Sequence, residues 1–241
     1  MLPNFAYGTA LVLLLGSGRC LAQGWSSDLS RDINGNFNNG YAMAPPDAGV
    51  VKGSYYMLPS WTPGEVLLVG NQKPVAVPLK YDLLRQELRV RRPQGDSVVV
   101  PLGRVQEFRL PQPAGAARRF LCFAPAKLPA AVGGACGEVL ADSPQLQLLK
   151  FRRSEVVTHQ DQSASYASNA TTKQYEEQAS YYLHYPADGR FVAVKPKRSS
   201  LEQALAGQSA ALAALKARKG SIGSEEELAA AVAAVAPALS K

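Results

Sequence analysis

Residues 73–92, KPVAVPLKYDLLRQELRVRR, alternate apolar and polar side chains, and this alternation constrains the fold more than any other feature of the chain. Successive side chains of a β-strand point to opposite faces, so alternation is typical of a strand with one buried face. The apolar residues occupy odd-numbered positions in the first half and even-numbered positions in the second, which requires a turn or bulge between them. The pattern predicts a hairpin of strands 74–83 and 87–92, because Pro74 and Pro78 are incompatible with one long helix.

Similar short patterns, separated by turn residues, recur along the chain. They predict strands at 65–69, 97–101, 105–110, 118–125, 137–141, 145–152, 180–185 and 190–195. The segment 118–125, RRFLCFAP, is apolar on both faces, which indicates a central strand. Residues 155–178 are polar and aperiodic, and we interpret them as a mobile or functional surface loop. The β domain therefore covers 54–196, and its fold class is mainly β: an antiparallel meander, a sandwich or an open barrel.

The pattern changes from period two to helical spacing after residue 196. Residues 199–203, SSLEQ, and 224–227, SEEE, both carry the capping-box signature of a helix start. We expect two or three short helices over 199–236, docked on the sheet, because alanine-rich helices of this length are marginal alone. The region 197–241 is thus a short C-terminal helical appendage.

The first 22 residues have the pattern of a secretory signal peptide. A short apolar run precedes small residues at Cys20 and Ala22, which favours cleavage before Gln23. A lipoprotein signal at Cys20 is the alternative, but Arg19 occupies a position where that processing needs a small residue. Residues 23–53 are rich in Asn, Gly, Ser and Pro, and we interpret them as a flexible arm.

The signal predicts an exported protein that is periplasmic, outer-membrane-associated or secreted. No later segment has the length and hydrophobicity of a transmembrane helix. The formal net charge of +7 favours anionic glycans, lipid headgroups or acidic proteins as partners rather than nucleic acid, since the chain is expected outside the cytoplasm. Solubility alone is the alternative explanation of this charge.

Cys122 and Cys136 are the cysteines that remain after signal removal. An oxidising compartment permits one disulfide between them. Two free thiols packed in the core are the alternative.

No pattern in the chain predicts a catalytic motif, a metal site or a cofactor site. The two histidines, His159 and His184, are too few for a typical zinc or iron site, even if Asp161 joined His159. We interpret His184 as a half-buried strand residue that faces the same way as Tyr182. Aromatic side chains that could fill the core or stack on sugars are Tyr55, Tyr56, Trp61, Tyr166, Tyr175, Tyr181, Tyr182 and Tyr185.

Four cations alternate with apolar residues on two of the predicted hairpins. Arg89 and Arg91 belong to the first hairpin, and Lys150 and Arg152 to another. If these hairpins share a sheet, the four side chains form one outward basic patch that binds phosphate or carboxylate groups. A solvated face without a ligand is the alternative.

Three segments resemble a family of exported proteins of Bacteroidota that has no established activity. They are GEVLLVGNQKPVAVPLKYDLLRQELRV, GEVLADSPQLQLLKFRR and the closing hairpin with its helical tail, YYLHYPADGRFVAVKPKRSSLEQAL. The resemblance implies an exported protein with a β core and a helical tail.

These observations together predict an envelope-associated protein that is a non-catalytic binding or structural module. The expected partners are an anionic envelope glycan or an envelope protein, with no cofactor. A hydrolase that acts on envelope polymers through a pair of carboxylates is the alternative.

Overall fold

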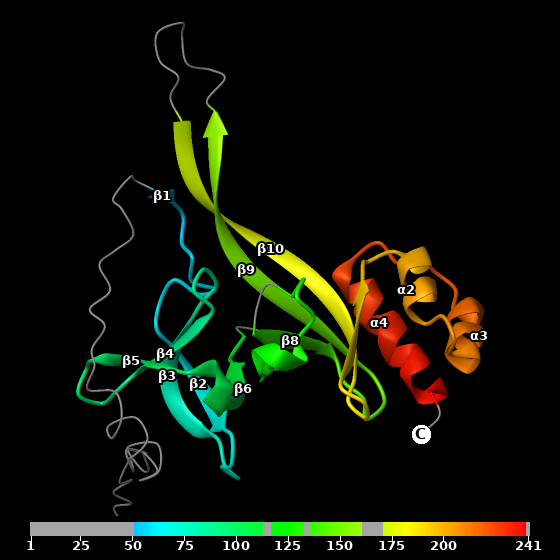
Figure 1. The fold of residues 1–241 in the computed structure, drawn as a ribbon, viewed down its shortest axis with the longest axis horizontal. Helices are drawn as coiled ribbons and strands as arrows, with labels where there is room; N and C mark the ends of the chain where they lie inside the picture. Colours follow the sequence, from blue (N-terminus) through cyan, green and yellow to red (C-terminus); the bar gives the residue numbers. More distant parts are fainter. Residues whose placement is uncertain (1–50, 113–116, 133–134, 161–170, 240–241) are drawn as a thin grey trace, which may run out of the picture.

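The structure, a computed structural model, describes the residues 51–112, 117–132, 135–160 and 171–239. The predicted signal peptide and almost all of the predicted arm lie outside these residues. The described chain is mainly β, as predicted, and its α-helices follow the last strand (Figure 1). One large mixed sheet contains all the described strands, and it does not close into a barrel.

The strands follow a meander in which most neighbours in the sheet are also neighbours in the chain. Their order is β1-β10-β9-β8-β7-β6-β2-β3-β4-β5, with β11 also paired to β10. Only the pairing of β1 with β10 is parallel among these strands. Their bounds are β1 Val51–Lys52, β2 Thr62–Leu68, β3 Val75–Asp82, β4 Glu87–Arg91, β5 Ser97–Val100, β6 Val105–Leu110, β7 Arg118–Cys122, β8 Cys136–Ala141, β9 Gln147–Gln160, β10 Thr171–Tyr185 and β11 Arg190–Val194.

The predicted first hairpin is confirmed as β3 and β4, which pair from Leu79 and Val90 to Asp82 and Glu87. The strand predicted to be central, β7, lies between β6 and β8. Its Phe120 is buried, and it stacks on Phe108 of β6 with 4.5 Å between the ring centres. Apolar alternation therefore located these strands correctly.

The interpretation of residues 155–178 as a loop is wrong. Most of this segment belongs to the distal halves of β9 and β10, which pair residue by residue as far as Gln160 and Thr171 (Figure 1). None of the described residues from 155 to 178 is buried, because the ribbon extends past the parts of the sheet that carry the apolar cores. Without a buried face there is no apolar alternation to recognise, and the backbone ladder holds the strands together.

The helical region begins within one residue of the predicted start and has the expected number of short helices. Ser224 and Glu227 form the predicted capping box of α4, whereas α2 starts after Lys197 and has no side-chain cap. The Ser200 hydroxyl instead accepts a hydrogen bond from the backbone N–H of Lys195 at 2.9 Å. None of the described helices is long and apolar enough to cross a membrane. The bounds are η1 Leu102–Arg104, η2 Pro125–Lys127, α2 Arg198–Ala204, α3 Ser209–Ala217, α4 Glu225–Val235 and η3 Ala236–Ala238.

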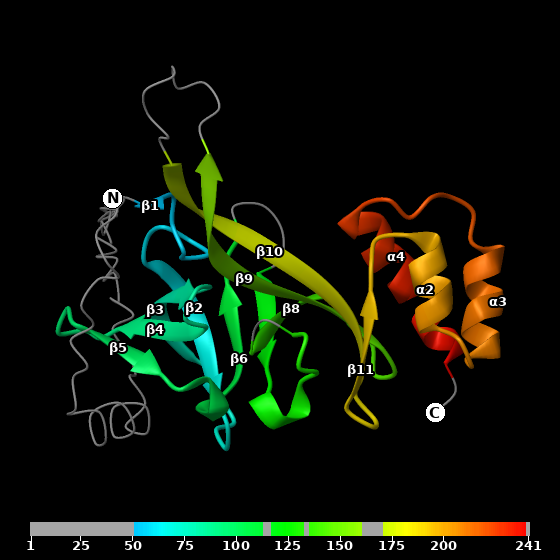
Figure 2. The ribbon, with the colours of Figure 1, turned by 45° about the horizontal axis from the view of Figure 1, so that its top comes forward.

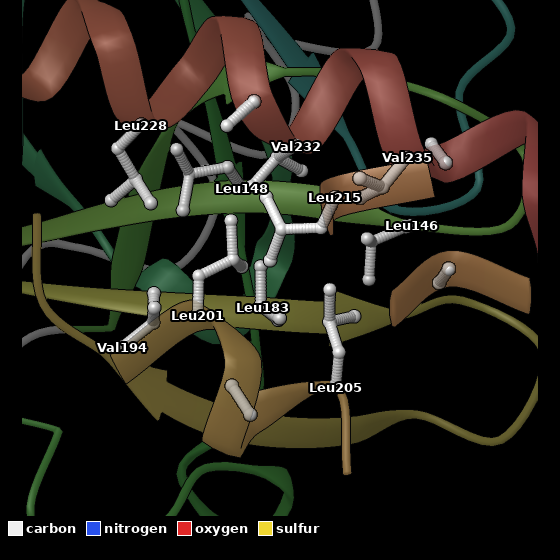
Figure 3. Close-up of a cluster of buried hydrophobic side chains, with 14 of the residues drawn as sticks. Leu146, Leu148, Leu183, Val194, Leu201, Leu205, Leu215, Leu228, Val232 and Val235 are labelled. Carbon is white, nitrogen blue, oxygen red and sulfur yellow. The ribbon is translucent and has the colours of Figure 1, made fainter. Parts of the chain in front are cut away.

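Two large hydrophobic cores lie at different places along the sheet. The first packs β2–β6 around Tyr81 and Phe108. The second packs the helices on β8–β11, with Leu148 and Leu183 pointing toward Leu201 of α2 and toward α4 (Figure 3). The helices are therefore docked on the sheet, as expected.

Strand β9 is buried on both faces where it crosses the molecule. Leu148 belongs to the core beneath the helices, while Leu149 and Phe151 join Tyr182 in a third cluster on the opposite face. This third cluster is covered by the chain around η2. A strand buried on both faces has few exposed side chains, so the polar residues that it carries need partners.

The turn between β3 and β4 is tied to the far side of the sheet by the side chain of Gln86. Its amide nitrogen donates to the carbonyl oxygens of Leu83 at 2.8 Å and Arg152 at 3.0 Å. Its amide oxygen accepts from the Tyr81 hydroxyl at 2.6 Å and from the Ala135 N–H at 3.3 Å. All four hydrogen-bonding positions of the amide are therefore used.

The Cys122–Cys136 disulfide is present, as one of the two sequence alternatives expected. The two residues face each other across the β7–β8 pair, with 4.0 Å between their Cα atoms. The bridge joins the two ends of the loop that contains η2 and covers the third hydrophobic cluster.

Replacement of Gln86 by alanine should lower the free energy of unfolding by about 2–4 kcal/mol, because it leaves the partly buried partners of the amide without a hydrogen bond. Urea denaturation measures this change. Gln178→Ala, at an exposed position on β10, is the matched control and should change stability by less than about 0.5 kcal/mol. Equal stability of the two variants would show that the Gln86 bridge does not hold the sheet.

Replacement of both bridged cysteines by serine should lower the stability by about 3 kcal/mol in the chain-entropy model, since the disulfide spans 14 residues. The same denaturation experiment in the presence and absence of reductant measures the effect. Alkylation of both thiols in the folded, unreduced protein would contradict the disulfide.

Candidate functional site

The four cations of the predicted basic patch do not lie on one exposed patch. Arg89 and Arg91 are on β4, whereas Lys150 and Arg152 are on β9, with β3, β2, β6, β7 and β8 between them in the sheet. Lys150 faces α4 and forms an ion pair with Glu225, and only 11% of its side chain is exposed. The sequence shows that Lys150 and Arg152 alternate with buried residues, but it does not show that their own face is also covered.

Arg152 belongs to a buried ion-pair cluster that spans β7–β10. Arg118 binds the two carboxylate oxygens of Glu138 at 2.7 and 2.8 Å, and Arg152 binds the same carboxylate at 2.7 Å. A second nitrogen of Arg152 lies 2.5 Å from Glu177. Burial disfavours the charged form of Glu138, but the hydrogen bonds from Arg118 and Arg152 outweigh it, so that the pKa of this carboxyl is lowered.

A second row of polar contacts runs across the opposite face of the sheet. Arg119 joins Glu107 to Asp142, at 2.9 and 2.5 Å, and Asp142 accepts a hydrogen bond from Gln147 at 2.7 Å. Gln147 in turn contacts His184 at 2.8 Å. Arg109 also binds Glu107, at 2.9 Å, so two arginines balance the two carboxylates of this row and leave little net field for a ligand.

The two histidines do not meet in the structure. Burial lowers the pKa of His184, which stacks on Phe191 with 4.5 Å between ring centres and is neutral at pH 7. His159 lies far along the β9–β10 ribbon, 2.7 Å from Glu176, and Asp161 is outside the described residues. No three metal-binding side chains gather within the described part of the chain.

A group of aromatic and basic side chains forms where the segment before β2 lies against β3. The Met57 N–H donates to the Tyr81 carbonyl at 3.0 Å, and the Leu83 N–H donates to the Tyr55 carbonyl at 2.9 Å. These backbone bonds hold Tyr55 and Tyr56 beside the end of β3. We call the resulting group the aromatic–basic strip; it contains Tyr55, Tyr56, Trp61, Lys80, Arg85, Arg89 and Tyr175.

The rings of the strip contact one another and the neighbouring cations. Tyr55 lies 4.5 Å from Tyr56 and 5.2 Å from Tyr175, measured between ring centres. The Lys80 ammonium lies 4.8 Å from the ring centre of Tyr56 and 5.6 Å from that of Trp61. All four rings are half-buried, so each retains some exposed surface.

Lys80 and Arg89 are direct cross-strand neighbours on β3 and β4. Like charges in this position repel each other and destabilise a sheet. Lys80 is held by the two rings and by the Pro59 carbonyl at 2.7 Å, while Arg89 is held by Glu87 at 3.4 Å. The arrangement keeps two positive charges side by side on the outer face of the hairpin.

The chemistry of the strip suits an anion better than it suits proton transfer. Two effects raise the pKa of Tyr56 to about 12: burial, which is the larger, and a hydrogen bond with Tyr55. The phenol of Tyr56 is therefore neutral at pH 7. Neutral aromatic hydroxyls can donate hydrogen bonds, and the cations can pair with carboxylate or phosphate. The sequence identified the aromatic residues and Arg89, but it missed Lys80 and Arg85. The signal for Lys80 was the alternation itself, since it places even-numbered residues of the first strand on the same polar face as odd-numbered residues of the second, such as Arg89.

Comparison with known proteins does not assign this chain to a family. The chain matches no family model, no curated protein and no solved structure. A functional assignment therefore depends on the described side chains, and the similarity to an exported Bacteroidota family stays a prediction.

The buried ion-pair cluster predicts how stability depends on pH. Because the pKa of Glu138 is lowered in the folded protein, its contribution is complete above its ordinary value of 4.5 and is lost as the pH falls below that value. Glu138→Gln should cost about 3 kcal/mol at pH 7, because two partly buried arginines lose their carboxylate. The same change should also make the free energy of unfolding less dependent on pH below 4.5, the part of the pH curve that we call the acid branch.

Urea denaturation from about pH 7 to about pH 3 measures both effects. The matched control is Glu155→Gln, which removes an exposed carboxylate paired with Arg153 and should cost less than about 1 kcal/mol. An acid branch as steep in Glu138→Gln as in the wild type would contradict the assigned role.

Proposed function

We propose that this protein is a non-catalytic binding module of the cell envelope that holds an anionic glycan on the aromatic–basic strip. The observation that carries the proposal is the pairing of Lys80 with Arg89 beside the half-buried rings of Tyr56 and Trp61. Aromatic faces stack on sugar rings, and the positive charge of Lys80 attracts the acidic groups of the polymer, while Arg89 beside it is shared with Glu87. One strip thus supplies both types of contact.

The distribution of the other charges supports the same site. Lys150, Arg118, Arg119 and Arg152 are bound to carboxylates inside the protein, so their charges are largely neutralised. Lys80 forms no ion pair with a described carboxylate; the groups that hold it are a backbone carbonyl and two rings. A carbonyl and aromatic rings leave the positive charge available to an incoming anion.

Location in the envelope rests on the sequence. Residues 1–22 have the signal-peptide pattern, and a disulfide is typical of proteins outside the cytoplasm. The resemblance to exported Bacteroidota proteins agrees with this location.

The alternative of a hydrolase needs two carboxylates that face one cavity, one of them with a raised pKa. Three cavities in the described part, two beside β10 and one around η2, have no Asp or Glu in their lining. Glu138, which binds the Arg152 that lines the first of these, has a lowered pKa, the opposite of what a general acid requires. The binding function is therefore the better supported of the two.

Trp61→Ala should weaken glycan binding about fivefold to tenfold through lost stacking, and Lys80→Gln should weaken it about threefold and reduce its salt dependence. Co-sedimentation with peptidoglycan sacculi and with lipopolysaccharide, at about 0.05 M and about 0.5 M salt, measures both. Neutral dextran beads should retain none of the proteins. Thermal unfolding of each variant shows whether it is folded.

Lys216→Gln is the matched control, since it removes one exposed positive charge from α3, far from the strip along the chain. It should bind like the wild type. Equal retention of Trp61→Ala and the wild type, or retention that is indifferent to salt, would rule out the strip as the glycan site.

A further inference from the structure

One edge of β10 is left open between two strands that pair with it. At one end β1 pairs with Lys173 and Gln174, and at the other end β11 pairs from Tyr181 onward. Gly53, just after β1, still lies beside the backbone of Tyr175. Over 176–180, β9 occupies one edge of β10, and none of the described strands occupies the other. Figure 2 shows β1 and β11 at opposite ends of this strand.

The open edge has a clear cause in the chain that follows β11. Val194, opposite Tyr181, is the last paired residue, and Pro196 follows two positions later. Proline has no N–H to donate to a ladder, and the chain turns away into α2. A longer β11 would continue beside residues 176–180 of β10, and we call this unoccupied position the vacant lane. It is five residues long, about 17 Å.

A groove lies at the end of this vacant lane, next to β11. It has a volume of about 450 Å³ and is lined by Ala179, Ser180, Tyr182 and Ala193, with Lys195 and Lys197 at its side. The small side chains leave room beside the edge, and the tyrosine ring provides an apolar wall. A second cavity of about 200 Å³ adjoins the same stretch of β10, next to Phe151 and Gln178.

The two lysines of the groove make its charge positive. Both are exposed, and neither forms an ion pair with any carboxylate that the structure describes. The carboxylates along the lane are already bound, Glu176 by His159 and Glu177 by Arg152. An occupant with acidic residues at the lysine end of the lane therefore meets complementary charge, while an occupant with basic residues there meets repulsion.

We propose that the open edge of β10 binds an extended acidic peptide segment of a partner protein, which adds a strand beside residues 176–180. The backbone of the segment forms the ladder, and its alternate side chains enter the groove. The segment runs antiparallel to β10, in line with β11, so its acidic residues are at its amino-terminal end, next to Lys195 and Lys197. This site is separate from the aromatic–basic strip and does not rest on the glycan function.

The test uses the full chain and a synthetic probe, the acetylated heptapeptide Asp-Asp-Thr-Val-Thr-Val-Thr with a carboxyl-terminal fluorophore. Fluorescence anisotropy should show saturable binding, about tenfold weaker when the two aspartates are moved to the other end or replaced by lysines. Equal binding of these peptides, or no binding up to about 1 mM, would overturn the proposal.

Backbone methylation of the probe tests strand addition directly. In an added strand, alternate residues direct their N–H toward the neighbouring strand and the others direct it away. One probe is methylated on its Thr amides and a second probe on its Val amides, which are the two alternate sets. One of the two should lose at least about tenfold in affinity, and the other should retain the affinity of the unmethylated probe. Equal behaviour of the two probes would contradict a β-ladder.

Variants of the protein show where on the molecule the probe binds. Lys195→Gln/Lys197→Gln should weaken binding about tenfold, whereas Lys216→Gln/Lys219→Gln, the same loss of charge at exposed positions around the end of α3, should not. A photocrosslinker at Gln178 should capture the probe. Crosslinks to residues 1–50 of the same chain, or to a second copy, would assign the edge to those occupants and overturn the proposal.

Discussion

The hydrogen bonds of Gln86 connect two parts of the sheet that lie far apart in its strand order. The residue sits in the turn after β3, yet its amide binds the Arg152 carbonyl of β9 and the Ala135 N–H just before β8. The backbone bond from the Ser154 N–H to the Leu83 carbonyl, at 2.9 Å, reinforces this contact. The sheet is therefore curled so that the β3–β4 turn rests on the β9–β10 ribbon. The curl brings Tyr55 and Tyr175 together, and the aromatic–basic strip depends on that meeting.

Charged residues divide into two groups with different roles in this curled sheet. The arginines and glutamates between the two large cores neutralise one another, as in the cluster of Arg118 and Arg152 with Glu138 and Glu177. Such a cluster contributes less to stability than an apolar core of the same volume, but loss of one partner is costly. Cations on the outer surface, at Lys80 and near the end of β11, lack carboxylate partners within the described residues. The outer group is the one available to ligands.

Local patterns identified most of the strands, because each has at least one buried face. Val75, Val77 and Leu79 alternate with polar or exposed residues, and they proved to be the buried face of β3. The same reasoning failed for the distal β9–β10 ribbon, where neither face is buried. It also failed for Lys150, since alternation in β9 shows which residues face Leu149 but not that α4 covers the opposite side. A pattern in one strand contains no information about the element that packs on it.

The sequence by itself determined the class of the fold, the position of most strands, the helical tail and the capping box at Ser224, because these depend on side chains close together in the chain. It also offered the pairing of Cys122 with Cys136 as one of two alternatives. Only the tertiary structure decided between a bridge and free thiols, placed Arg152 inside the protein and left an edge of β10 open beside Lys195. These features depend on contacts between residues far apart in the chain, and long-range contacts follow from how the whole sheet curls rather than from any local period.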